Sequence, residues 1–314
     1  MNRVMFVGLH LMNRLSTVER ELIASVVMFY QMIMCILTKD MAEEHVRFAE
    51  QLLVLPMTNF IQTERNGDIM NPVLILTHDN LDLTKQCVES LRKQDIPVSI
   101  FIVDNGSSDD TVVYFSCVED IPCMRLQTNT GFSHGINVGL KWVFDAMSAD
   151  YCLCPGSDTI MPPSYYRLLL ELNLPVVSGV QDIDGHRVTM EDLEKPFPVQ
   201  PINPNPDFSC LLWRKEAWNK FGGLDETMIN YASDCDLHVR AHRKGIRLNH
   251  AQVPFFHYGS STIKNAPPRE KKEIEMQADA DRLTFRDKWG FFIGSKEYNE
   301  QFDEKNFGVD AKGV

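Results

Sequence analysis

The order of apolar and polar segments predicts alternating strands and helices from residue 71 onward. Short apolar runs bounded by turn residues predict strands near residues 72–77, 98–103, 122–127, 151–155, 175–180 and 208–213. Amphipathic patterns predict helices near residues 81–94, 133–148, 163–171, 215–220 and 233–244. Residues 181–207, rich in Pro and Asp, predict a long loop. This alternation is typical of an α/β fold with a mostly parallel central sheet and right-handed crossovers.

The two ends of the chain depart from this pattern. Residues 1–69 predict a helical N-terminal extension, in which the apolar stretch 22–38 has about the minimum length for a membrane crossing. Charged residues flank that stretch closely, so we expect a helix buried against the rest of the chain or in a homodimer, with membrane-surface contact as the alternative. Residues 266–314 predict a C-terminal helical tail, whose charged helix over 267–289 is expected to have a solvated face. The domain between them spans residues 70–265.

Composition narrows the class of protein. An apolar content of 44% is enough for a real core, and a net charge of -12 argues against a protein that coats nucleic acid. The eight cysteines form no C-x-x-C pair, and several lie in apolar runs. We therefore expect reduced core cysteines in a cytoplasmic protein, since no cleavable secretory signal is evident and only the apolar N-terminal stretch suggests membrane association.

Polar, Gly-rich turns follow the first two predicted strands. The first strand ends in Thr77-His78-Asp79-Asn80, and the second ends in Asp104-Asn105-Gly106-Ser107-Ser108-Asp109. In open α/β sheets, ligands bind at the carboxyl ends of the strands. The pattern therefore predicts a ligand site at this edge, with a nucleotide as the expected ligand.

Five ordered blocks between Asn71 and Ser261 resemble family 2 glycosyltransferases with the GT-A fold. They are NPVLILTHDNLDLTKQCVESLRKQ, IFIVDNGSSDDT, NTGFSHGINVGL, YCLCPGSDT and GGLDETMINYASDCDLHVRAHRKGIRL, with FFHYGSS just beyond the last. The resemblance implies a Rossmann-like GT-A domain. It also implies inverting transfer of a sugar from a nucleotide-diphosphate sugar, with a UDP-sugar as the expected donor, to an acceptor hydroxyl.

Asp158 and His257 are the candidate metal ligands. Asp158 lies in a tight turn after a strand, where a hard carboxylate can hold Mn²⁺ or Mg²⁺. The resemblance makes it the second acid of an Asp-x-Asp motif, in which Gly156 replaces the first acid and Ser157 belongs to the donor site. It also makes His257 a metal or diphosphate contact. One imidazole with one carboxylate suits Mn²⁺ somewhat better than Mg²⁺.

Asp234 is the candidate catalytic base. The segment Ser233-Asp234-Cys235-Asp236-Leu237 resembles the Glu-Asp-x-Asp-Leu motif of the family, with Ser233 in place of the Glu. It opens a predicted helix, whose dipole favours an ionised carboxylate at its N-terminus. A base at neutral pH needs that ionised form. Asp236, with Arg240 four residues on, predicts an ordinary helix ion pair.

The resemblance also assigns residues to the nucleotide and acceptor sides. Asp104 is expected to accept the N3–H of uracil, with Thr77 lining the same pocket. Gly131 and Asn137 are expected near the nucleotide or sugar, Gly131 because it permits close backbone approach. On the acceptor side, Asp225 and Glu226 match an Asp-Glu pair of the family, and Trp213 is a further candidate because Trp faces often stack on sugar rings.

Other functions fit parts of the pattern. The two replaced acids, at Gly156 and Ser233, favour a non-catalytic protein that binds sugar nucleotides or glycans, whereas the retained Asp158, Asp234 and His257 argue against it. A nucleotidyltransferase is disfavoured because no Gly-rich loop with Arg follows the first strand. The acceptor stays open between a glycan, a lipid-linked sugar and, as in phage-type enzymes, a hydroxymethylated DNA base. The acidic net charge counts against DNA.

Overall fold

The structure is a computed structural model that describes residues 71–183, 185–197, 201–204, 206, 208–259 and 268–310, without the side chains of 201–204 and 270. The predicted N-terminal extension and its apolar stretch at 22–38 lie outside the described residues. The larger compact unit comprises Ile69–Thr111 and Arg125–Val314, and Val112–Met124 do not belong to it. All of the candidate site belongs to this larger unit.

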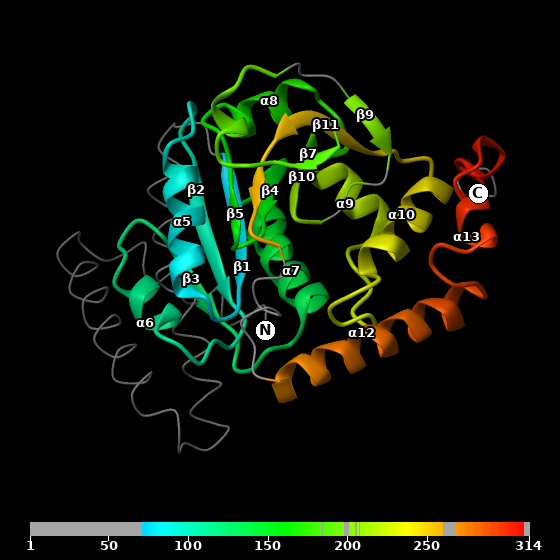
Figure 1. The fold of residues 1–314 in the computed structure, drawn as a ribbon, viewed down its shortest axis with the longest axis horizontal. Helices are drawn as coiled ribbons and strands as arrows, with labels where there is room; N and C mark the ends of the chain where they lie inside the picture. Colours follow the sequence, from blue (N-terminus) through cyan, green and yellow to red (C-terminus); the bar gives the residue numbers. More distant parts are fainter. Residues whose placement is uncertain are drawn as a thin grey trace, which may run out of the picture. The chain divides into compact units, whose positions relative to one another are not determined.

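Seven strands of the larger unit lie in one sheet in the order β2-β1-β4-β10-β6-β11-β9 (Figure 1). Their bounds are β1 Pro72–Thr77, β2 Ser99–Asp104, β4 Tyr151–Pro155, β6 Val176–Val180, β9 Pro201–Pro204, β10 Cys210–Arg214 and β11 Leu248–Pro254. Strands β2, β1, β4, β6 and β11 share one direction, whereas β10 and β9 run against it. The α/β fold with a mostly parallel sheet is therefore confirmed.

Helices cover both faces of the sheet. On one face, α5 (Leu81–Arg92) packs so that the Thr84 hydroxyl lies 2.8 Å from that of Thr77 in β1. On the other face, Gly135 and Gly139 of α7 (Phe132–Lys141) lie against Leu76 and Leu74 of β1. The other helices are η1 Trp142–Ala146, α8 Tyr165–Glu171, α9 Lys215–Phe221 and α10 Ser233–Arg243. Apolar residues alternate between the two faces of β1, and this two-sided burial explains its continuous apolar run.

Three differences from the sequence-based prediction bear on the site. Strand β10 runs antiparallel between β4 and β6. The predicted loop 181–207 contains the hairpin β7–β8 (Asp182–Ile183 and His186–Arg187), η2 (Asp192–Glu194) and β9. A separate ribbon pairs β5 (Thr159–Ile160) with β12 (Phe256–His257). That ribbon joins two distant parts of the chain, which a strand-by-strand interpretation of the sequence does not reveal.

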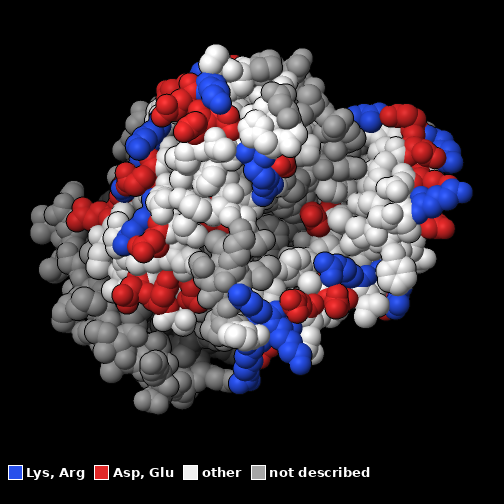
Figure 2. Space-filling view, viewed as in Figure 1, with Lys and Arg blue, Asp and Glu red and all other residues white. Residues whose placement is uncertain are grey.

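The C-terminal segment is packed through one side of its long helix. Helix α12 (Pro268–Trp289) buries Ala278, Asp281 and Phe285, while its other sides carry surface ion pairs such as Arg282–Asp279. Acidic and basic side chains are mixed along this helix in Figure 2. Phe285 packs with Met228, Ala232 and Val239 around α10. The helix thus has a solvated face, as predicted, and also a buried one. The short helices α6 (Thr111–Ser116), α13 (Lys296–Glu300) and η3 (Glu304–Asn306), with strand β3 (Cys123–Arg125), complete the described elements.

Two further expectations concern membrane contact and cysteines. Within the described ranges, no helix combines the length and the apolar character that a membrane crossing needs. The seven cysteines of those ranges are all free thiols, and the sulfur atoms of Cys152 and Cys154 lie 4.0 Å apart on one face of β4.

Candidate functional site

The β5–β12 ribbon brings the two candidate metal ligands together. His257 pairs with Thr159 across the ribbon, and Asp158 directly precedes that residue. The backbone carbonyl of Asp158 also accepts the N–H of Tyr258 at 3.1 Å. As a result, His257 Nε2 lies 3.2 Å from Asp158 Oδ1, and each side chain is less than a fifth exposed. The carboxylate and the imidazole form one site at the carboxyl end of β4.

A third residue fixes the orientation of the His257 ring. Gln181, which follows β6, has its Oε1 2.8 Å from His257 Nδ1. An amide oxygen only accepts hydrogen bonds, so Nδ1 carries the hydrogen and Nε2 is the nitrogen turned toward Asp158. Hydrogen-bonded partners of this kind orient the imidazole ligands of metal sites.

A second acid at position 156 would crowd the turn before Asp158. A Cβ added at Gly156 would lie 3.2 Å from both Asp158 Oδ1 and the carbonyl oxygen of Ser209. The Gly156 N–H donates to that Ser209 carbonyl at 2.7 Å, which ties the turn to the start of β10. Ser157 occupies the tip of the turn and is half-buried. Gly156 in place of the first acid therefore matches the local packing.

The donor set at this edge fits a hard divalent cation that keeps ligand positions for diphosphate oxygens. A carboxylate oxygen and an oriented imidazole nitrogen are ligands that Mn²⁺ accepts, and Mg²⁺ binds with one or two protein groups plus substrate phosphates. Within the described residues, no cluster of three or more His, Cys, Asp or Glu side chains has the geometry of a closed metal site. A cation held by Asp158 and His257 would therefore share its remaining positions with substrate and water.

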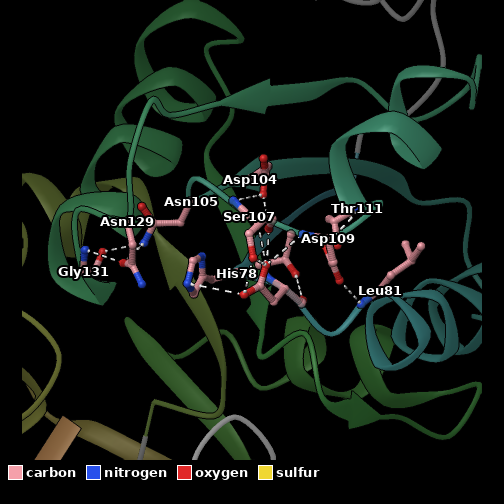
Figure 3. Close-up of polar contacts among 12 residues, drawn as sticks. His78, Leu81, Asp104, Asn105, Ser107, Asp109, Thr111, Asn129 and Gly131 are labelled. Atoms are coloured by element: carbon pink, nitrogen blue, oxygen red, sulfur yellow. Dashed lines mark hydrogen bonds and ion pairs between the residues drawn. The ribbon is translucent and has the colours of Figure 1, made fainter. Parts of the chain in front are cut away.

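Hydrogen bonds to two carboxylates join the turn after β1 to the turn after β2 (Figure 3). Asp79 accepts the backbone N–H groups of Ser108 at 2.6 Å and Asp109 at 3.2 Å. Asp109 in return accepts the N–H of Leu81 at 3.1 Å and that of Thr111 at 3.0 Å. Burial alone would raise the pKa of Asp109, but these hydrogen bonds lower it. The pair fixes the strand-end turns where the sequence predicted a nucleotide.

Asp104, the candidate for contact with the base, is engaged inside the protein. Its Oδ1 accepts the Ser107 N–H at 3.1 Å and the Ser107 hydroxyl, and its Oδ2 accepts Arg125 Nη1 at 2.9 Å. Complete burial raises its pKa, against the opposing effects of Ser107 and Arg125. In this arrangement Asp104 holds the turn after β2, and a base would reach its carboxylate only if Arg125 moved. Thr77 is also buried, with its hydroxyl bonded to Thr84.

The neighbouring turn presents polar groups on the same edge. The Asn105 side chain donates to Asn129 Oδ1 and to the Gly131 carbonyl, both at 3.1 Å, and accepts the Thr130 N–H at 2.9 Å (Figure 3). This places the start of α7 against the carboxyl end of β2. His78 lies in the turn after β1, and its Nδ1 is buried with no hydrogen-bond partner in the described structure.

Gly131 allows a close approach by another part of the protein backbone. Gly131 has φ 87° at the start of α7, and a Cβ there would clash with Cγ2 and the carbonyl oxygen of Ile229. The Ser133 N–H donates to the Ile229 carbonyl at 3.1 Å, and the Phe132 N–H donates to Asn230 Oδ1 at 3.0 Å. The segment before α10 is therefore fastened to the same edge as the ends of β1 and β2.

Asp234 lies in the first turn of α10, directly after that fastened segment. It is half-buried, and its Oδ1 accepts the N–H of Cys235 at 2.7 Å. Burial, and then the charge of Asp234, raises the pKa of the Cys235 thiol to about 12.

Asn137 contacts the turn that carries the two acidic acceptor-side candidates. Its Nδ2 donates to the Leu224 carbonyl at 2.9 Å and to Glu226 Oε1 at 2.7 Å. Hydrogen bonds from His134 and Asn137 lower the pKa of Glu226. Burial raises the pKa of Asp225, but Lys288 and Thr227 together bring it down to about 2. This group tethers the 224–226 turn to α7 and α12.

Trp213, the third acceptor-side candidate, lies in the core. It is 1% exposed, and its ring contacts Phe208, Trp218 and Phe221. The indole lines a small apolar pocket between β10 and α7, together with Leu76 and Ile136. Its faces are covered by protein side chains and are not offered to a sugar ring.

Several site residues were not singled out from the sequence. Gln181 follows a predicted strand, and nothing in its neighbours marks it as the partner of His257. Asp79 and Asp109 lie in turns that the sequence did flag, yet their reciprocal contacts depend on the pairing of β1 with β2. Asp236 was predicted to form an ordinary helix pair, but it is fully buried and contacts Arg240, Trp289 and Lys288.

Comparisons with known proteins add to this geometry. Residues 73–181 match the model of glycosyl transferase family 2. No curated protein sequence matches the chain. Among solved structures, S. aureus TarS 1-349 has a TM-score of 0.48 at 17% identity, covering 74% of this chain and 78% of that one. The same fragment in complex with UDP-GlcNAc gives 0.46 at 17% identity, covering 74% and 78%. The mannosyltransferase PcManGT from Pyrobaculum calidifontis, in complex with GDP-Man and Mn²⁺, gives 0.42 at 13%, covering 78% and 85%.

The α/β sheet, with polar turns at the carboxyl ends of β1, β2 and β4, and the family match of residues 73–181 together indicate a glycosyltransferase domain. The family model matches the segment that carries those strand ends, residues 73–181 of the 314.

Proposed function

We propose that this chain is a metal-dependent, inverting glycosyltransferase that moves a sugar from a nucleotide-diphosphate sugar to an acceptor hydroxyl. The observation that carries the proposal is the 3.2 Å approach of Asp158 and His257 at the carboxyl end of β4. A Mn²⁺ or Mg²⁺ ion held there would neutralise the charge that develops on the leaving diphosphate. The sequence resemblance favours a UDP-sugar as the donor.

The proposed reaction is a single displacement. Asp234 accepts the proton of the acceptor hydroxyl, and the hydroxyl oxygen attacks the anomeric carbon on the face opposite the diphosphate. The bond between the anomeric carbon and the diphosphate oxygen breaks, and its electron pair leaves with the nucleoside diphosphate. Attack from the opposite face inverts the anomeric configuration. Placement at the start of α10 supports Asp234 in this role, because the helix N-terminus favours a carboxylate.

The chain's own groups also position the donor. The turns after β1 and β2, which Asp79 and Asp109 join by hydrogen bonds, form a fixed edge of the sheet for the nucleotide. Ser157 adds a hydroxyl beside Asp158. Preorganised groups of this kind lower the barrier, since the reacting atoms are held in place before reaction. Asp225 and Glu226 border the acceptor side in the proposal, and a glycan or lipid-linked sugar is the expected acceptor.

The test is release of nucleoside diphosphate by the full chain. The protein is mixed with UDP-glucose and a panel of other sugar nucleotides, with Mn²⁺, Mg²⁺ or EDTA. We expect release that needs the metal, is lost in Asp158→Ala and His257→Ala, and persists in Glu89→Gln, a control on the exposed side of α5.

Two outcomes would contradict the proposal. Failure of the folded protein to bind any sugar nucleotide with metal present would remove the donor site. Tight binding with no turnover, with or without a panel of glycan acceptors, would instead favour the non-catalytic sugar-nucleotide binding protein that Gly156 and Ser233 first suggested.

A further inference from the structure

We propose that Asp281 of α12 is a positioning residue for Asp234: its buried carboxylate holds the segment that leads into α10 and so aims the proposed base. This inference rests on the proposed function, because it assigns a partner to the residue that takes the acceptor proton. It makes α12, at the C-terminal end of the chain, part of the active site.

Three consecutive backbone N–H groups converge on this one carboxylate. Asp281 Oδ2 accepts the N–H groups of Asn230 and Tyr231, both at 2.8 Å, and Oδ1 accepts that of Ile229 at 3.1 Å. Gln277, one turn earlier on α12, donates its side-chain amide to Oδ1 at 2.8 Å. Asp281 is 1% exposed. A buried carboxylate is tolerated only where donors of this kind satisfy it, so the segment and α12 depend on each other.

The backbone just beyond these donors is strained. Ala232 has φ 63°, a left-handed conformation that residues with a Cβ rarely adopt, and it immediately precedes the first residue of α10. Such a conformation persists only where the surroundings hold it. The Asp281 contacts on the three preceding residues supply that restraint, and Asp234 follows Ala232 by two positions.

The same segment is held from the opposite side by α7. The Ser133 hydroxyl donates to the Met228 carbonyl at 2.6 Å, the Ser133 N–H donates to that of Ile229, and Asn230 caps Phe132. The start of α7 is in turn bonded to Asn105 at the end of β2. Residues 228–231 therefore lie between the nucleotide edge and α12. Loss of the Asp281 hydrogen bonds would free residues 228–231 on the α12 side only and would leave the turns after β1 and β2 intact.

The experiment compares Asp281→Asn with Asp279→Asn in the full chain. Asp279 lies two residues earlier on α12, is exposed, and forms a surface ion pair with Arg282. Transfer rate, donor KM, UDP binding with Mn²⁺ and thermal stability are measured for each variant. We expect Asp281→Asn to lower kcat by about 10- to 100-fold with donor KM and UDP affinity within about 2-fold, because misplacement by about 1 Å can reduce the rate that far. Asp279→Asn should match the unmodified chain.

The pH profile separates positioning from a purely structural role. The acid limb of kcat reports the pKa of the base in the enzyme–substrate complex. We expect this limb to shift in Asp281→Asn, because Asp234 changes its surroundings, and to stay fixed in Asp279→Asn. A parallel fall of kcat and UDP affinity with an unshifted limb would overturn the inference and leave a structural role only.

Two further variants keep the test informative. Gln277→Met retains the carboxylate and removes one of its donors, so it should fold and lower kcat by a smaller factor, about 2- to 5-fold. An unchanged kcat in both Gln277→Met and Asp281→Asn would overturn the inference. Asp234→Asn distinguishes failure of the positioning role from failure of the proposed function. If Asp234→Asn retains transfer, Asp234 is not the base. If Asp234→Asn loses transfer and Asp281→Asn does not, only the positioning role of Asp281 is removed.

Discussion

Gln181 Oε1 accepts a hydrogen bond from His257 Nδ1 at 2.8 Å and thereby selects the ring nitrogen that faces Asp158. With hydrogen on Nδ1, a neutral ring turns the Nε2 lone pair toward a carboxylate oxygen. Two electron-rich atoms at this distance are stabilised by a positive charge between them, either a second proton on the ring or a cation that both groups hold. Gln181 therefore orients His257 so that its Nε2 and the Asp158 carboxylate can hold a cation together.

Replacement of Gln181 should weaken metal binding without touching a metal ligand. We expect Gln181→Leu to reduce Mn²⁺ affinity by about 10- to 100-fold, as loss of an outer-shell partner does in other metal sites. Gln181→Glu keeps an acceptor oxygen for Nδ1 and adds a negative charge near the cation, so its affinity should be equal to or higher than that of the unmodified chain. Calorimetric titration with Mn²⁺ measures both. Equal affinities in Gln181→Leu and the unmodified chain would show that the Gln181 contact has no such role.

Gly131→Ala should destabilise the chain more than alanine at another left-handed glycine. Gly131 has φ 87° and faces Ile229, whereas Gly185 has φ 81° and an added Cβ there meets nothing within 4 Å. Backbone strain alone predicts a loss of about 1–2 kcal/mol at Gly185. The clash with Ile229 should add about 1–3 kcal/mol at Gly131, as overpacking does elsewhere. Urea unfolding of both variants measures the difference, and equal losses would mean that Ile229 yields without strain.

The Lys288–Asp225 ion pair predicts how stability depends on pH. Lys288 and Thr227 outweigh burial and hold the pKa of Asp225 near 2, below its ordinary 3.8. A lowered folded-state pKa means that the ionised carboxylate stabilises the fold above the unfolded pKa, and that this contribution is lost as the pH falls toward 2. The stability difference between the unmodified chain and Lys288→Met should therefore narrow as the pH falls from about 5 to about 2. Urea unfolding across that range tests it, and a constant difference would show that protonation of Asp225 does not remove the stabilisation that Lys288 provides.

Phe285 should dominate the packing of α12. It is fully buried against Met228, Ala232 and Val239, so Phe285→Ala is expected to lower the free energy of unfolding by about 3–5 kcal/mol. Leu283, two residues earlier on the same helix, is 45% exposed, and Leu283→Ala should change stability by no more than about 0.5 kcal/mol. Denaturant midpoints measure both. Similar small losses would show that α12 contributes little to the fold.

Local sequence pattern was sufficient for most of the strands and helices around the site, although not for the β5–β12 ribbon. Strands β1 and β4 were placed at their observed bounds, and β2, β6 and most helices within one or two residues, because apolar runs ending in polar turns mark buried strands directly. The direction of β10 was not predictable, since a strand buried on both faces has the same apolar run whether it is parallel or antiparallel. Strand β11, LNHAQVP, was missed because its polar residues break both the apolar run and the alternation.

The family motif marked Asp158 and His257 as candidates, and the structure places them in contact. The motif was less informative about Asp104, Gly131 and Asn137, whose side chains or backbone are engaged with protein groups. Contacts that join distant segments, such as Gln181 with His257 and Asp281 with residues 229–231, depend on tertiary packing. A charged residue within a charged helix has no local feature that distinguishes a buried anchor from a surface group.

The turn at Gly156 limits how this enzyme can be redesigned. A side chain at position 156 would begin 3.2 Å from both Asp158 Oδ1 and the Ser209 carbonyl oxygen. Gly156→Asp would therefore displace the acid it was meant to assist, unless the start of β10 moved with it. A second carboxylate therefore has to be introduced together with a small shift of the Asp158 side chain or of the start of β10, because both border position 156.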